Sequence, residues 1–138
     1  MSRLIFASLF VAAAAVAAAG CGTNEDFFNP PTGPAPVPTT EVFQGTLTRN
    51  GATTHPFSVQ AGGTITATLT VVDPDATIGL SLGTWNGLGC SITIAIDRAV
   101  KGTVATGTAS TVGNLCVRVY DIGEFTAPTA YEVSVFHP

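Results

Sequence analysis

The stretch Thr64-Ile65-Thr66-Ala67-Thr68-Leu69-Thr70-Val71-Val72 alternates threonine with aliphatic side chains at almost every position. Successive side chains of a β-strand point to opposite faces, so the alternation predicts one apolar face and one face of threonines. Because threonine is β-branched, this pattern indicates a strand in a sheet that has one face in water. The residues expected on the apolar face are Ile65, Ala67, Leu69 and Val71.

The residues before this stretch show a similar period of two. Residues 41–48 and 54–60 read as two strands, and Asn50-Gly51 lies between them. Asn-Gly is a strong hairpin signal because both residue types tolerate positive φ, so a hairpin is expected here. Pro56 lacks a backbone N–H group, which favours either an edge position for the second of these strands or a strand start at this residue.

The residues after it continue the pattern to the end of the chain. Alternating apolar residues recur within 78–82, 90–96, 103–109, 115–120 and 131–135. No window after residue 40 shows a helical period of 3.6. About eight short strands with turn signals every 8–12 residues predict a single all-β sandwich of antiparallel strands. The strand order stays open between a jelly-roll-like and an immunoglobulin-like sandwich.

The N-terminus has the composition of an export signal. Arg3 precedes an apolar run over residues 4–19 that ends in small residues, as in a secretory signal peptide. The run is short for a membrane span, which needs about 20 apolar residues. The sequence Ala18-Ala19-Gly20-Cys21 resembles a bacterial lipobox, with Ala18 where leucine is usual. The resemblance implies that residues 1–20 are removed and that Cys21 carries the lipid.

Residues 21–40 read as a linker between that cysteine and the sandwich. Prolines crowd the segment, which favours an extended polyproline II spacer of roughly 3.1 Å per residue. The domain is then expected over residues 41–138. The prolines of the linker are Pro30, Pro31, Pro34, Pro36 and Pro38.

Charge and the lipobox together predict where the protein resides. Without Arg3, four basic residues remain against nine acidic ones, a formal charge of −5. Nucleic acid is excluded as a partner because its phosphates require many Lys and Arg contacts. The expected membrane link is the lipid anchor, in an exported protein of the cell envelope. Gly22 stands where aspartate favours inner-membrane retention in some bacteria, so the outer membrane is the expected destination.

Cys90 and Cys116 remain once Cys21 is assigned to lipid. An even pair in an exported chain predicts a disulfide. Two buried thiols or zinc ligands are the alternatives, although His55 and His137 show no zinc-site spacing with these cysteines. The two histidines, which have no charged neighbours in sequence, are expected at the surface.

Several strand segments occur in the order seen in bacterial pre-peptidase C-terminal domains, and residues 41–138 resemble that family. The family resemblance implies a β-sandwich associated with secretion, with surface or substrate binding, and sometimes with calcium. This chain departs from the family because no peptidase domain accompanies the sandwich, so only a binding or structural role carries over. The matching segments are Phe57-Ser58-Val59, Gly62-Gly63-Thr64, Leu80-Ser81-Leu82, Val117-Arg118-Val119-Tyr120-Asp121 and Tyr131-Glu132-Val133-Ser134-Val135.

Two loops hold candidate binding residues. Asp73 and Asp75 flank Pro74, and paired carboxylates on a loop can bind calcium, although such residues also cap turns. Trp85 and Asn86 lie in a Gly-rich loop, where an aromatic ring and an amide can bind a sugar. A single tryptophan also commonly closes one end of a core. No cofactor is expected unless calcium binds.

Gly79-Leu80-Ser81-Leu82-Gly83 matches the nucleophile elbow of hydrolases, G-x-S-x-G. That motif works on a strand-to-helix turn, whereas Ser81 lies within an alternating strand and is expected on its solvent face. No catalytic residue is therefore predicted. The expected function is a non-catalytic, lipid-anchored envelope protein that displays a binding or structural module. A carbohydrate- or protein-binding module acting in trans for a secreted hydrolase, or a calcium-stabilised structural module, is the alternative.

Overall fold

The computed structural model describes residues 33–138. The predicted signal peptide, the predicted lipidation site Cys21 and most of the predicted linker lie outside the described residues. Residues 33–38 are exposed and belong to no strand, and the first strand begins at Thr39. The sandwich therefore begins two residues earlier than the sequence predicts.

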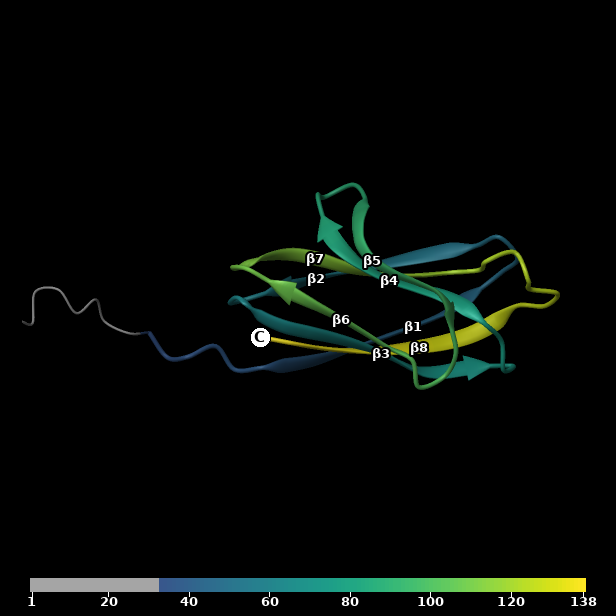
Figure 1. Ribbon diagram of the computed structural model, residues 1–138, viewed down its shortest axis with the longest axis horizontal. Helices are drawn as coiled ribbons and strands as arrows, with labels where there is room; N and C mark the ends of the chain where they lie inside the picture. Colours follow the sequence, from purple (N-terminus) through teal and green to yellow (C-terminus); the bar gives the residue numbers. More distant parts are fainter. Residues whose placement is uncertain (1–32) are drawn as a thin grey trace, which may run out of the picture. The chain divides into compact units, whose positions relative to one another are not determined.

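Eight strands form two four-stranded antiparallel sheets (Figure 1). We name the sheet with the order β1-β8-β3-β6 sheet A, and the sheet with the order β2-β7-β4-β5 sheet B. The all-β sandwich predicted from the sequence is confirmed. The strands are β1 (Thr39–Leu47), β2 (Ala52–Val59), β3 (Gly63–Asp73), β4 (Ile78–Trp85), β5 (Cys90–Ala99), β6 (Val104–Ala109), β7 (Gly113–Tyr120) and β8 (Thr129–His137).

The connections between strands decide the topology. Only β4 and β5 are successive strands that pair, and each of the other six connections crosses from one sheet to the other. Crossing connections of this kind, with eight strands in two four-stranded sheets, are those of a jelly roll. The immunoglobulin-like alternative is therefore excluded by the strand order.

The core lies between the two sheets and is almost entirely aliphatic. The alternating residues of β3, β4, β7 and β8 meet there, and most of them are fully buried. Burying a Val, Leu or Ile side chain contributes about 1.5–3 kcal/mol, so these positions supply most of the stability. The central residues include Leu69, Leu80, Val117, Val119, Val133 and Val135.

The hairpin expected at Asn50-Gly51 does not form. A tight turn is present, in which Asn50 has a φ of 55° and the Gly51 N–H donates to the Thr48 carbonyl over 2.8 Å. However, β1 pairs with β8 and β2 pairs with β7, so the turn joins two sheets instead of two neighbours. The expected edge position of Pro56 is confirmed, because β2 is the first strand of sheet B.

A β-bulge changes which residues of β3 face the core. The pairing of β3 with β8 shifts register between Leu69 and Val71, which leaves one extra residue, Thr70, in β3. A bulge reverses the parity of the residues beyond it. Val72, and not Val71 as expected, is therefore buried.

The outer face of β4 is also buried, contrary to the expectation for Ser81. Its side chain is 1% exposed and donates to the Arg118 carbonyl of β7 over 3.3 Å. The Tyr120 ring lies against Gly79, where a Cβ atom would collide with it. Arg118 in turn lies over the Tyr120 ring, 5.8 Å from its centroid. Side chains of β7 thus cover the face of β4 that the sequence pattern assigns to solvent.

Cys90 and Cys116 form a disulfide, as predicted, with Cα atoms 5.9 Å apart. The two residues lie at the start of β5 and in the middle of β7, the two strands that flank β4. Cys116 is fully buried but faces away from the core, opposite to Val117. The bond therefore joins β5 to β7 across the end of β4.

We expect reduction of this disulfide to lower the free energy of unfolding by about 3.5 kcal/mol, because the bond closes a loop of 26 residues. Urea unfolding of the domain with and without reductant measures the difference. The double variant Cys90→Ala/Cys116→Ala is the control and should not respond to reductant. Equal unfolding midpoints of the oxidised and reduced wild type would contradict the prediction.

Candidate functional site

The sandwich has two ends with different loops. At the end that we call the linker end, Thr39 of β1 pairs with His137 of β8, and the Gln60 N–H donates to the Pro138 carbonyl. The loops 60–62, 86–89 and 110–112 belong to this end, because the strands that they join finish or begin there. The loops 48–51, 74–77, 100–103 and 121–128 form the opposite end, which we call the far end.

The predicted ligand residues Trp85 and Asn86 lie in the β4–β5 hairpin, which stands out from sheet B (Figure 1). Trp85 is half-buried, at the end of β4 and paired with Cys90. The Asn86 Oδ1 atom accepts the N–H groups of Leu88 and Gly89 over 2.9 and 2.8 Å. The hairpin turn is thus held by the Asn86 side chain and by the disulfide at Cys90, the residue that follows the turn.

A depression of about 540 Å³ lies beside this hairpin. Two residues of its lining are hydrogen-bonded to each other: the Ser58 hydroxyl donates to the Asn114 Oδ1 atom over 2.8 Å. The carboxamide oxygens of Asn86 and Asn114 are both used within the protein, so each side chain can offer its N–H groups to a ligand. The lining residues are all uncharged: Pro56, Phe57, Ser58, Trp85, Asn86, Gly87 and Asn114.

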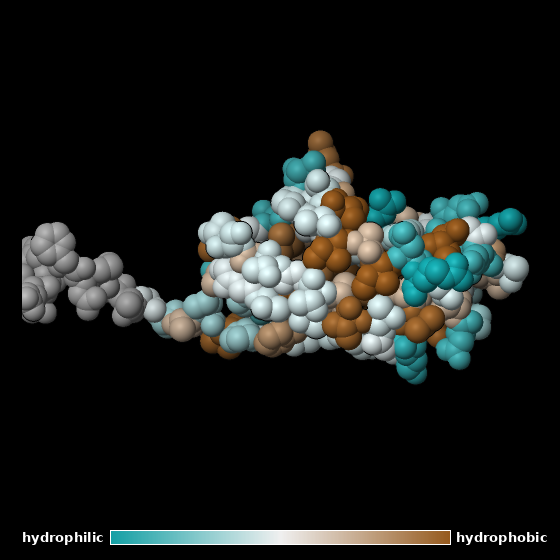
Figure 2. All heavy atoms as spheres, in the orientation of Figure 1, coloured by the Kyte–Doolittle hydropathy of each residue, from teal (hydrophilic) through white to brown (hydrophobic). Residues whose placement is uncertain are grey.

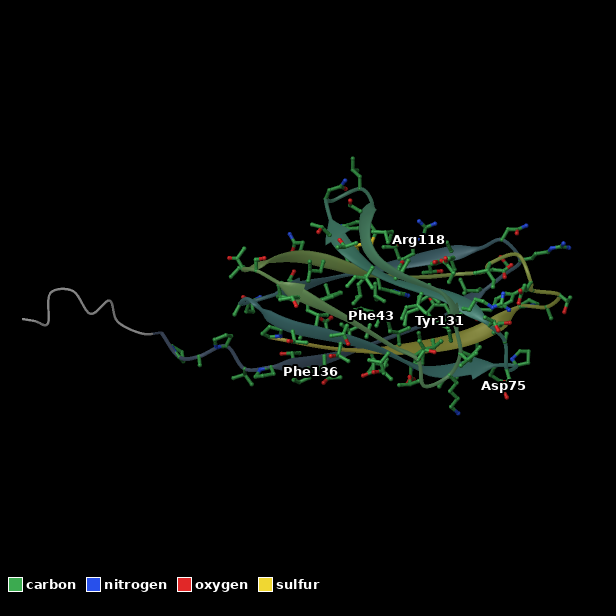
Figure 3. The ribbon with its side chains drawn as sticks, viewed as in Figure 1. Phe43, Asp75, Arg118, Tyr131 and Phe136 are labelled. Atoms are coloured by element: carbon green, nitrogen blue, oxygen red, sulfur yellow. A yellow bond between two sulfur atoms is a disulfide. The ribbon has the colours of Figure 1, made fainter. Side chains whose placement is uncertain are left out.

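The predicted calcium residues Asp73 and Asp75 lie at the far end, where both are exposed. Figure 3 shows Asp75 at this end of the domain. Asp75 lines a depression of about 260 Å³ together with Glu124, which also forms an ion pair with Arg98 over 3.4 Å. Within residues 33–138, no three His, Cys, Asp or Glu side chains lie close enough together to hold a metal ion. Calcium binding at Asp73 and Asp75 stays a prediction.

Asp121 has a structural role at the same end. Its Oδ2 atom accepts the Asn50 N–H over 2.7 Å, and its Oδ1 atom accepts those of Gly123, Glu124 and Phe125 over 3.0–3.3 Å. Burial acts to raise the pKa of Asp121, but the four N–H donors outweigh it and lower the pKa below the usual value. The carboxylate therefore ties the β1–β2 turn to the β7–β8 loop.

Trp85 and the loop that begins at Asp121 do not form one site. Trp85 follows Thr84, which pairs with Leu115 near the start of β7, whereas Asp121 comes after the last residue of that strand. The two segments lie at opposite ends of the sandwich. The residues that line the depression with Trp85 come from its own hairpin turn, from β2 and from β7.

Both histidines are less exposed than the sequence suggested. His137 is buried, with its Nε2 atom 3.0 Å from a Glu41 oxygen and its ring beside Phe57. His55 is half-buried, stacks on Phe43, and has its Nε2 atom 2.7 Å from the Tyr131 hydroxyl. Figure 3 shows Phe43 and Tyr131 between the sheets.

Burial lowers the pKa of His55 and raises that of Tyr131, which favours the neutral form of each. The sequence did carry a signal for these positions. His55 shares its parity with Phe57 and Val59, and His137 shares its parity with Val133 and Val135, all of which are buried.

The remaining motif, around Ser81, lacks the surroundings of a nucleophile. Ser81 lies inside β4 and no helix follows that strand.

None of the described residues forms a helix long and apolar enough to span a bilayer. No protein-family model and no curated protein match this chain.

We expect Asp121 to contribute stability that is lost in acid. The pKa of Asp121 is lower in the folded state than in the unfolded state, where it is about 3.9. The contribution of Asp121 to the free energy of unfolding is therefore full above the unfolded-state pKa and is lost as the pH falls through the folded-state pKa. Asp121→Asn should therefore unfold at lower temperature than wild type at pH 7, and the difference should shrink below about pH 4. Asp75→Asn, an exposed change at the same end, is the control. A difference that is constant from pH 7 to pH 3 would contradict the assignment.

Proposed function

We propose that the protein is a non-catalytic lipoprotein of the cell envelope, in which Cys21 anchors one jelly-roll domain to a membrane. The lipobox-like sequence Ala18-Ala19-Gly20-Cys21 carries the proposal. The Cys90–Cys116 disulfide supports it, because structural disulfides persist in exported proteins and are rare in reducing compartments. The exposed prolines that precede β1 are consistent with a spacer between anchor and domain.

The domain acts as a binding or structural module in this proposal. The domain is a β-sandwich. Its resemblance to the pre-peptidase C-terminal domains, which are β-sandwiches of exported proteins, supports such a role. Ser81, the one residue in a hydrolase-like motif, is buried and bonded to the backbone. A calcium-stabilised version of the module would use Asp75 at the far end, where Glu124 lines the same depression.

We expect Cys21→Ala to release the protein from membranes, because the anchor depends on the thioether formed at that sulfur. Membrane fractionation followed by detergent phase partitioning measures the change, and incorporation of labelled palmitate reports the acyl chains directly. Thr23→Ala, two residues later, is the matched control and should stay in the detergent phase. Equal partitioning of Cys21→Ala and wild type would refute the anchor.

The second candidate function is binding of a neutral oligosaccharide at the depression beside Trp85, in trans to a separate hydrolase. The observation that favours it is the lining, which combines an aromatic ring with two carboxamides and no charge. A sugar ring presents an apolar C–H face to an aromatic side chain and hydroxyl groups to amides. The rigid hairpin would reduce the entropy lost on binding.

We expect Trp85→Ala and Asn114→Ala each to weaken oligosaccharide binding about 10-fold, a loss of about 1.4 kcal/mol. A glycan array identifies the ligand, and calorimetry on the selected oligosaccharide gives the affinities. Lys101→Ala at the far end is the control for the variant proteins. If no neutral glycan on the array binds the protein, oligosaccharide binding is ruled out. The same conclusion follows if both substituted proteins are folded and bind the oligosaccharide with the wild-type affinity.

A further inference from the structure

Charged residues are divided unequally between the two ends of the sandwich. The linker-end loops read Gln60-Ala61-Gly62, Asn86-Gly87-Leu88-Gly89 and Ser110-Thr111-Val112, and none contains Asp, Glu, Lys or Arg. By contrast, each far-end loop carries at least one charge. In the view of Figure 2, the most strongly hydrophilic residues are most numerous at the far end of the domain, on the right. The charged residues of the far-end loops are Arg49, Asp75, Lys101, Asp121 and Glu124.

The uncharged loops also expose large apolar side chains at their tips. Leu88, at the turn of the β4–β5 hairpin, is 95% exposed, and Val112, in the β6–β7 loop, is 61% exposed. Trp85 immediately precedes the turn of the same hairpin and is half-buried. Isolated exposed apolar residues are ordinary on protein surfaces, and Val100 in a far-end loop is also 50% exposed, beside Lys101. Leu88 and Val112 differ from Val100 because they lie on loops that carry no charge.

We propose that the linker end of the domain docks on the bilayer interface, with Leu88 and Val112 entering among uncharged lipid headgroups. This inference rests on the proposed lipid anchor at Cys21. The chain reaches the domain at this end, since β1 begins at Thr39, only 18 residues after Cys21. The predicted extended spacer can lie along the membrane surface as well as stand away from it, so it keeps the domain within reach of the bilayer, where a weak surface affinity is sufficient for docking.

The chemistry of the surface fits a neutral lipid interface. Without Lys or Arg in its loops, this end gains nothing from anionic headgroups, and without Asp or Glu it is not repelled by them. Tryptophan is enriched at the level of lipid headgroups, where the apolar ring and the polar N–H are both accommodated. Glu41 is the charged side chain nearest the start of β1, and it is paired with His137.

The single tryptophan of the sequence provides the test. The mature lipidated protein is reconstituted in phosphatidylcholine vesicles, with brominated acyl chains in one sample and ordinary chains in the other. Flotation first reports whether the protein is anchored. We expect Trp85 fluorescence to be quenched in the brominated vesicles relative to the ordinary ones, because docking brings the hairpin to the depth of the acyl chains.

Two variants localise the contact. Leu88→Asp/Val112→Asp should still float but should lose the quenching, whereas Ala127→Asp, an exposed change at the far end, should keep it. A thermal melt checks that each variant is folded. Floating protein without quenching, or quenching that survives in Leu88→Asp/Val112→Asp, would overturn the docking proposal and leave the anchor intact. Protein that does not float would overturn the anchor and the docking together.

Discussion

The packing of sheet A on sheet B is the interaction on which the rest of the structure depends. Because six of the seven connections cross between the sheets, neither sheet can form from one continuous stretch of chain. β1 and β8, for example, pair with each other although they are the first and last strands in the sequence. Such non-local pairing has a large loop-closure cost, and burial of the aliphatic faces at about 25 cal/mol per Å² is the term that offsets it.

The sequence predicts the class of this fold well and its connections poorly, for a physical reason. Alternation in a stretch such as Thr64–Leu69 is local, so it identifies a strand and its buried face. Pairing is not local: Asn50-Gly51 does form a tight turn, yet nothing in those residues says that the strands beyond it belong to different sheets. The bulge at Thr70 is equally invisible, because it arises from the register with β8.

The residues of the candidate site also differ in whether local sequence or strand pairing determines their positions. Trp85 and Asn86 could be chosen from sequence because they adjoin each other in a Gly-rich loop, and the disulfide followed from the cysteine count. Ser58 and Asn114 could not, since they reach the hairpin only through the pairing of β2 with β7. The burial of Ser81 depends on cover from β7, which alternation within β4 does not report. The burial of His137 differs, because alternation with Val133 and Val135 along β8 does report it.

The two proposals for the Trp85 hairpin place opposite demands on one surface. A glycan must enter the depression from water, whereas docking on a bilayer turns the hairpin toward the lipid. Both cannot hold for one molecule at one time, so anchoring at the linker end would leave the far end to meet envelope partners. That end is the one with exposed charge, including the Arg98–Glu124 pair and Lys101. Charged rims set specificity and encounter rate more than affinity, which suits a displayed module that recognises partners transiently.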